Sequence, residues 1–162
     1  MPRTLIAGFG NALRGDDGFG VEVIRRLERE QTLDESVSLL EVGTGGISLA
    51  QELLATYDRL IIVDAMARGG APGTVYLLEV ESVETASTVD PHLAVPARAL
   101  SLAKALGVLP PAIFLVGCEP SSVDELSTEL TPVVADAVDP VISHIAALTA
   151  ARPDRRQEGA GT

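Results

Sequence analysis

The sequence is short of cysteine, aromatic residues and positive charge. It has one cysteine, Cys118, and no tryptophan, and 12 basic residues stand against 23 acidic ones, for a net charge of −11. A lone cysteine forms no internal disulfide, which suits a reducing compartment. The negative charge disfavours nucleic acid and anionic membrane surfaces as partners, because phosphates are bound by clustered Lys and Arg.

Long apolar runs are missing as well. The N-terminal stretch MPRTLIAGFG is too short for a signal peptide, and no stretch holds the roughly 18 uninterrupted apolar residues typical of a membrane span. We therefore expect a cytoplasmic, monomeric protein. Because the chain has 162 residues and 46 % are hydrophobic, it can bury a core. We expect one α/β domain over residues 1–150 and a flexible polar tail over residues 151–162.

The first half of the chain alternates between apolar strands and amphipathic helices. This pattern predicts a parallel sheet with helices on both faces. The predicted strands are Thr4–Phe9, Val37–Val42 and Arg59–Val63, and the predicted helices are Gly18–Gln31 and Ile47–Ala55.

The alternation is interrupted after Asp64. The link ARGGAPG leaves no room for a crossover helix before the strand-like segment Thr74–Val80. Because a short link joins antiparallel neighbours, we expect this fourth strand to run against the others. A helix over Val95–Leu106 and a strand over Ala112–Val116 follow.

The last predicted helix has a clear start. Thr131 is a candidate N-cap, and Pro132 suits the first helical position. Pro140 lies inside this predicted helix, so we expect it to kink the helix.

Candidate functional residues follow the first and third strands. Ligands of open α/β sheets bind beyond the carboxyl ends of the strands, where Asp16, Asp17 and Asp64 converge if these two strands are neighbours. His92 lies on the segment after the fourth strand, residues 81–94, which carries the chain back toward this edge, so it can reach the same site. Two carboxylates and an imidazole suit nickel or zinc. The alternatives are plain ones: Asp16 or Asp17 caps the following helix, Asp64 starts a turn, and His92 begins a helix.

Other motifs are weaker. The stretch GFGNALRG has Leu13 in place of the third glycine of GxGxxG and lacks the GK[ST] of a P-loop, so we expect no tightly bound organic cofactor. Cys118 in VGCEP is either a nucleophile or, more simply, a small buried residue. The turn formed by Gly43, Thr44, Gly45 and Gly46 offers exposed amides that could bind a peptide backbone.

Five motifs in order resemble the hydrogenase maturation endopeptidase family: GFGNALRGDDGFGVEVIRRL, EVGTGG, DRLIIVDA, DPH and VGCEP. The resemblance runs to about Leu148. It implies a three-layer α/β/α fold around a five-stranded, mostly parallel twisted sheet with one antiparallel strand, of the phosphorylase/hydrolase-like type.

The resemblance also implies a function. Proteins of this family remove a C-terminal extension from the large-subunit precursor of nickel–iron hydrogenase after nickel insertion. By alignment of the motifs, Asp17, Asp64 and His92 are the metal-binding residues, and Asp16 is a supporting catalytic candidate. The nickel carried by the substrate then serves for recognition, or a bound metal activates water with Asp16 as base. A thiol hydrolase using Cys118 and a non-catalytic metal-binding module are the competing classes.

Overall fold

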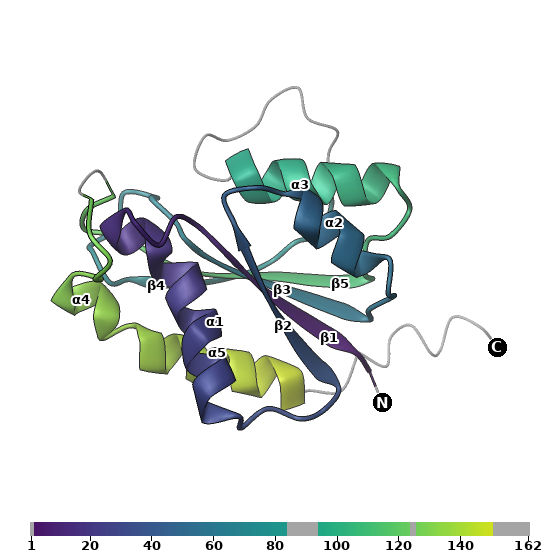
Figure 1. Ribbon diagram of the computed structural model, residues 1–162, viewed down its shortest axis with the longest axis horizontal. Helices are drawn as coiled ribbons and strands as arrows, with labels where there is room; N and C mark the ends of the chain where they lie inside the picture. The colour runs from purple at the N-terminus through teal and green to yellow at the C-terminus, as the bar shows by residue number, and fades with distance from the viewer. Residues whose placement is uncertain (1, 84–93, 124–125, 151–162) are drawn as a thin grey trace.

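Five strands form one sheet in the order β2-β1-β3-β5-β4 (Figure 1). The computed structural model describes residues 2–83, 94–123 and 126–150. The strands are β1 (Thr4–Phe9), β2 (Val37–Gly43), β3 (Arg59–Ala65), β4 (Val75–Glu79) and β5 (Ala112–Cys118). β1 pairs in parallel with β2 and β3, and β3 pairs in parallel with β5. β1 therefore lies between β2 and β3, so the first and third strands are neighbours, which is the condition for their acids to converge.

Helices cover both faces of the sheet. They are α1 (Phe19–Glu30), α2 (Ile47–Leu53), α3 (Ala94–Ala105), α4 (Pro132–Ala135) and α5 (Val138–Ala150), with a 3-10 turn, η1 (Gly15–Gly18), before α1. Figure 1 shows α2 and α3 on one side of the sheet and α1, α4 and α5 on the other. The predicted three-layer α/β/α architecture is confirmed.

Each face of the sheet has its own hydrophobic core, which explains why the central strands are apolar throughout. On β3, Leu60 and Ile62 pack in the core beneath α2 and α3. The alternate residues Ile61 and Val63 pack with α1 and α5. A strand buried on both faces loses the usual polar alternation.

The direction predicted for β4 is confirmed, but its neighbour is not the expected one. β4 runs antiparallel to β5, with Val75 opposite Cys118, and not beside β3. The link that follows β3 passes around the end of β5 instead: Met66 N–H donates to the Cys118 carbonyl, and Gly73 N–H donates to that of Glu119. These two hydrogen bonds pair the backbone of the link with the end of β5, the strand that lies between β3 and β4. The length of the link alone does not reveal this arrangement.

Pro140 interrupts the last helix. A turn at residues 136–137 separates α4 from α5, one helical turn before Pro140. Because proline has no backbone N–H, Pro140 donates no hydrogen bond to the carbonyl of Asp136, four residues earlier. Pro132 occupies the first turn of α4 as predicted, but Thr131 makes no capping bond with its side chain.

The segment Pro132–Ala150 is long and apolar enough to cross a membrane by length and composition alone. Its apolar residues Val134, Val138, Val141 and Ile145 are buried in the core under α1. Because 28 % of the apolar window is buried, packing against the sheet accounts for part of its apolar character.

Two glycines let α1 lie directly on the sheet. A Cβ on Gly20 would stand 2.2 Å from the carbonyl oxygen of Val63 and 2.5 Å from that of Phe9. A Cβ on Gly8 would stand 2.5 Å from the carbonyl oxygen of Gly20. This close approach brings the start of α1, together with η1, to the carboxyl ends of β1 and β3.

Candidate active site

The loop after β1 folds back over the end of β3. Gly10 has a φ of +120°, and a Cβ there would lie 1.9 Å from the carbonyl oxygen of Asp17 and 3.7 Å from Oδ1 of Asp64. Only glycine fits this position, because its backbone conformation and the neighbouring carbonyl both exclude a side chain. The structure thus brings Asp17 and Asp64 to one place, as the strand order predicts.

The two acids differ in their surroundings. Asp64 is 9 % exposed, and burial together with the charge of Asp17 raises its pKa to about 8. Asp17 is half-buried, and its Oδ2 accepts the N–H of Asn11 at 2.9 Å. A cation between two such carboxylates would offset both the repulsion and the desolvation of the buried charge.

His92, the third predicted ligand, lies outside the described residues. Within the described ranges no group of three or more His, Cys, Asp or Glu side chains forms a metal site. The chain's other histidine, His144, is exposed on α5. Asp17 and Asp64 therefore supply two candidate ligands, and the role of His92 stays a prediction.

Asp16 turns away from this pair and anchors a distant segment. Its side chain is fully buried. Oδ2 accepts the N–H groups of Ser121 and Ser122 at 2.8 and 3.0 Å, as well as the hydroxyl of Thr131 at 2.8 Å. Oδ1 accepts the N–H of Thr131 at 2.7 Å. Both oxygens are thus occupied by donors from the segment between β5 and α4.

These contacts give the ionised carboxylate of Asp16 a structural role. Burial alone would raise the pKa of Asp16, but the hydrogen bonds from Thr131, Ser122 and Ser121 outweigh it and hold the pKa below its usual value. Neither Asp16 nor Asp17 caps α1, since its N-cap is Gly18 and no side chain bonds there.

The glycine turn after β2 lies next to the acid pair. Gly43, with φ of +69°, accepts the N–H of Gly10 at 2.9 Å. Among the described residues, no atom lies within 4 Å of a Cβ built on Gly43 or Gly45, whereas Gly46 packs against Ala99 of α3. The turn is thus open to solvent beside the site, and its binding of a substrate backbone remains a prediction.

Cys118 is fully buried at the end of β5. Burial, with smaller contributions from Asp16 and Glu119, raises the pKa of its thiol to about 11. A thiol that is both inaccessible and protonated is a poor nucleophile at neutral pH, so the structure favours the small buried residue over the thiol hydrolase.

Sequence reasoning missed Glu119. This buried acid accepts the N–H groups of Arg68 and Gly70 at 2.8 and 2.7 Å and the hydroxyl of Tyr76 at 2.8 Å. It thereby fixes the link that follows Asp64. The only signal in the sequence was a carboxylate directly after an apolar strand, which by itself does not distinguish a loop anchor from a ligand.

The molecule is thus a three-layer α/β protein with two acids at the carboxyl edge of neighbouring parallel strands, where this class of fold carries its active sites. Residues 21–148 match the family model described as hydrogenase maturation protease. The chain therefore belongs to the hydrogenase maturation protease family, and it is a peptidase.

Individual relatives agree. The chain is 34 % identical over 143 residues to the hydrogenase expression/formation protein HupD of Bradyrhizobium diazoefficiens, a match that covers 86 % of this chain and 74 % of the relative. It is 35 % identical over 148 residues to the hydrogenase 2 maturation protease of Escherichia coli, covering 90 % of this chain and 89 % of that protein.

A solved structure gives the same result. The hydrogenase maturating endopeptidase HybD from E. coli superposes with a TM-score of 0.77 at 33 % identity, and the match covers 97 % of this chain and 94 % of that one. The resemblance noted from the sequence motifs is confirmed.

Proposed function

We propose that this peptidase removes the C-terminal extension from the large-subunit precursor of a nickel–iron hydrogenase after nickel insertion, and that it recognises the nickel carried by the substrate. The observation that carries the proposal is the convergence of Asp17 and Asp64 at the carboxyl edge of β1 and β3. The family supports the substrate class, since one relative is named for maturation of hydrogenase 2.

The candidate ligands of this chain suit a metal ion that is already bound to the substrate through ligands of the substrate. Asp17 and Asp64 offer carboxylate oxygens, and His92 is the proposed imidazole. Nickel accepts oxygen and nitrogen donors besides thiolates, so ligands from this chain can complete the shell of a nickel ion that the substrate holds through sulfur. Holding the metal positions the nearby peptide, and the open turn at 43–46 is the proposed seat for its backbone.

Hydrolysis then adds water to the carbonyl carbon of the positioned peptide. The C–N bond breaks, and a proton passes to the leaving amine. Asp16 is a poor candidate for the base that activates this water, because the donors from Ser121, Ser122 and Thr131 stabilise its charged form. These contacts favour the account in which the substrate's nickel serves for recognition.

The decisive experiment incubates purified large-subunit precursor, with and without nickel, with the wild-type protein and measures its mass before and after. Shortening of the nickel-loaded precursor alone is the expected result. If both forms are shortened at equal rates, nickel recognition is refuted but the proposed cleavage stands. If neither form is shortened, the proposed cleavage is refuted and a non-catalytic binding module is favoured.

Variants test the three residues. Asp17→Ala, Asp64→Ala and His92→Ala should each abolish shortening, because each removes a ligand from the shared metal. Exposed residues of the same types provide matched controls: Asp136→Ala on the end of α4 and His144→Ala on α5 should process the precursor at the wild-type rate. Full activity in the His92→Ala protein would exclude the imidazole from the site.

A further inference from the structure

Two exposed leucines lie on adjacent backbone segments, one of them on the loop that carries Asp17. Arg14 and Ser127 form a parallel β-bridge, held by bonds from Ser127 N–H to the Leu13 carbonyl and from Gly15 N–H to the Ser127 carbonyl, both 2.9 Å. In parallel pairing the preceding residues, Leu13 and Leu126, are also neighbours. Leu13 is 60 % exposed and Leu126 is 86 % exposed. We call these two residues the leucine pair.

Hydrogen bonds to Asp16 lie on both sides of Leu126 in the sequence. The buried carboxylate of Asp16 anchors both ends of the segment that carries Leu126, through Ser121, Ser122 and Thr131. Asp16 N–H also donates to the Ser122 carbonyl at 3.0 Å. Scattered exposed leucines are ordinary, but two on backbone segments that are bonded to each other provide exposed apolar area at one place.

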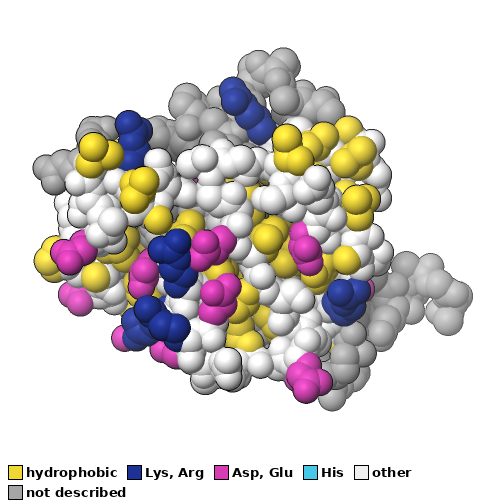
Figure 2. All heavy atoms as spheres, viewed as in Figure 1, with side chains coloured by type: hydrophobic (Ala, Val, Ile, Leu, Met, Phe, Trp, Pro, Cys, Tyr) yellow, Lys and Arg dark blue, Asp and Glu magenta, His cyan; other side chains and the backbone are white. Residues whose placement is uncertain are grey.

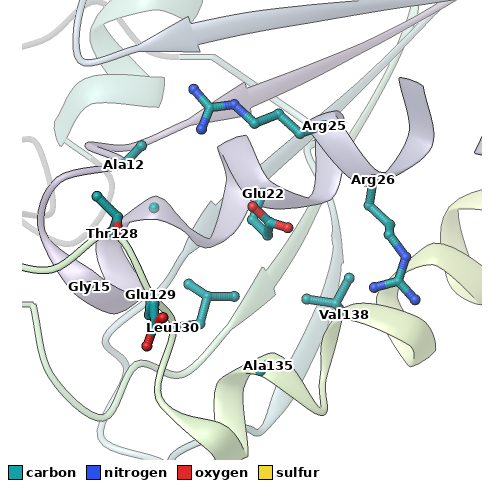
Figure 3. A pocket seen from close by; sticks show the side chains of 11 residues that line it. Ala12, Gly15, Glu22, Arg25, Arg26, Thr128, Glu129, Leu130, Ala135 and Val138 are labelled. Atoms are coloured by element: carbon teal, nitrogen blue, oxygen red, sulfur yellow. The ribbon is translucent and has the colours of Figure 1, made fainter. Parts of the chain in front are cut away.

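A hollow continues this surface. It has a volume of about 270 Å³ and is lined by residues that flank the leucine pair in sequence, among them Ala12, Gly15 and Thr128 (Figure 3). Leu130 and Val138 contribute further apolar lining between η1 and α5.

Charged side chains also line the hollow: Glu22, Arg25 and Arg26 of α1, together with Glu129. Arg25 is paired with Glu41, and Arg26 is paired with Glu30 and Asp139. Figure 2 shows basic and acidic side chains gathered over the middle of this face, with hydrophobic ones exposed toward the end where η1 and α4 lie. The hollow thus combines apolar and charged lining, and protein–protein interfaces contain both kinds of surface.

We propose that the leucine pair and the hollow form the docking surface for the folded body of the hydrogenase large-subunit precursor. This proposal rests on the proposed function. Leu13 lies on the same loop as Asp17, and Asn11 of that loop donates its N–H to the Asp17 carboxylate. A partner seated on Leu13 therefore lies alongside the acid pair.

The position of the surface also argues for the substrate as its occupant. The open turn at 43–46, proposed for the scissile peptide, leads into α2, whereas the hollow lies between α1 and α5 in the opposite layer. The body and the extension of one precursor would thus contact separate sides of the same edge.

The test compares Leu126→Asp and Leu13→Asp with Leu54→Asp, the last a matched control because Leu54 is 63 % exposed at the end of α2, away from the carboxyl edge. With nickel-loaded precursor as substrate, each docking variant should raise KM about tenfold or more, as expected for a leucine buried at the centre of an interface. The kcat should stay within about twofold, because the acid pair is intact. Leu54→Asp should leave both constants unchanged.

Affinity of the precursor for each variant is measured separately from cleavage, and melting temperature confirms folding. Wild-type KM and affinity in Leu126→Asp and its milder counterpart Leu126→Ser would overturn the docking surface while leaving the protease intact. A wild-type protein that binds precursor without shortening it would refute the proposed hydrolysis alone. A concentration-dependent wild-type dimer that Leu126→Asp dissociates would assign the surface to self-association and overturn the proposal.

Discussion

Removing the carboxylate of Asp16 should destabilise the protein strongly. The side chain is fully buried and accepts four hydrogen bonds, two from Ser121 and Ser122 and two from Thr131. A hydrogen bond to a charged group contributes about 1.5–3 kcal/mol, but such terms are not additive within one network. Breaking a buried charged network costs about 3–5 kcal/mol in measured cases. We therefore expect Asp16→Ala to lower the free energy of unfolding by about 4 kcal/mol.

That loss is large against the roughly 5–15 kcal/mol of a typical domain. For a chain of this length it corresponds to a fall in melting temperature of roughly 8–16 °C. Asp16→Asn should lose about half as much, because its amide keeps one acceptor oxygen but sets an NH₂ group against the backbone donors. Urea unfolding followed by circular dichroism measures these changes. Asp136→Asn, at an exposed position, is the control and should change stability by less than about 0.5 kcal/mol.

The pH dependence gives an independent check. The native pKa of Asp16 is lowered, so its contribution to stability is fully present above the unfolded value of about 4 and is lost as pH falls through the native value. The stability gap between the wild type and Asp16→Asn should therefore narrow below about pH 4. A loss under 1 kcal/mol in Asp16→Ala, or a gap that does not change with pH, would refute the anchoring role. Wild-type stability combined with loss of processing would instead favour Asp16 as the catalytic base.

Two further predictions concern packing. Gly20→Ala should cost about 3 kcal/mol or more in urea unfolding, because its Cβ meets the carbonyl oxygen of Val63 at 2.2 Å; Gly45→Ala, where no atom lies within 4 Å, should stay within about 1 kcal/mol of the wild type, and equal losses in both would contradict the packing argument. Cys118 should resist alkylation at pH 7.5 in the native protein and react quickly in urea, since its thiol is buried with a pKa of about 11. Rapid native labelling that abolishes processing would restore the thiol hydrolase.

Much of the fold could be predicted from local pattern. Apolar runs such as Arg59–Val63 and the helical spacing of Phe19, Val23 and Leu27 gave the alternation of strands and helices, because burial on two faces or one imposes a recognisable period. The pairing of β4 with β5 could not be predicted, since a strand inserted later in the chain took the position beside β3. Link length restricts direction, and competition among all strands for partners decides the neighbour.

The candidate site, like the fold, could be predicted from the sequence only in part. The glycine loop and the acids at the ends of β1 and β3 are enough to make Asp16, Asp17 and Asp64 candidates, because the carboxyl ends of parallel neighbours share one edge. The separate roles of the adjacent Asp16 and Asp17 cannot be read from the sequence. Which of two neighbouring carboxylates faces the site and which anchors a loop depends on the donors that the segment at 121–131 brings from far along the chain.

The sequence by itself determined the layered α/β fold, the family and the loop that carries the acids, since these follow from periodicity, glycine positions and ordered motifs. Only the tertiary structure decided that Asp16 and Glu119 are buried loop anchors, that Cys118 is inaccessible and that Leu13 and Leu126 are exposed on adjacent backbone segments. The reason is physical: burial and hydrogen-bond partners arise from contacts between residues far apart in the chain, more than a hundred positions in the case of Asp16 and Thr131, and no local pattern encodes them.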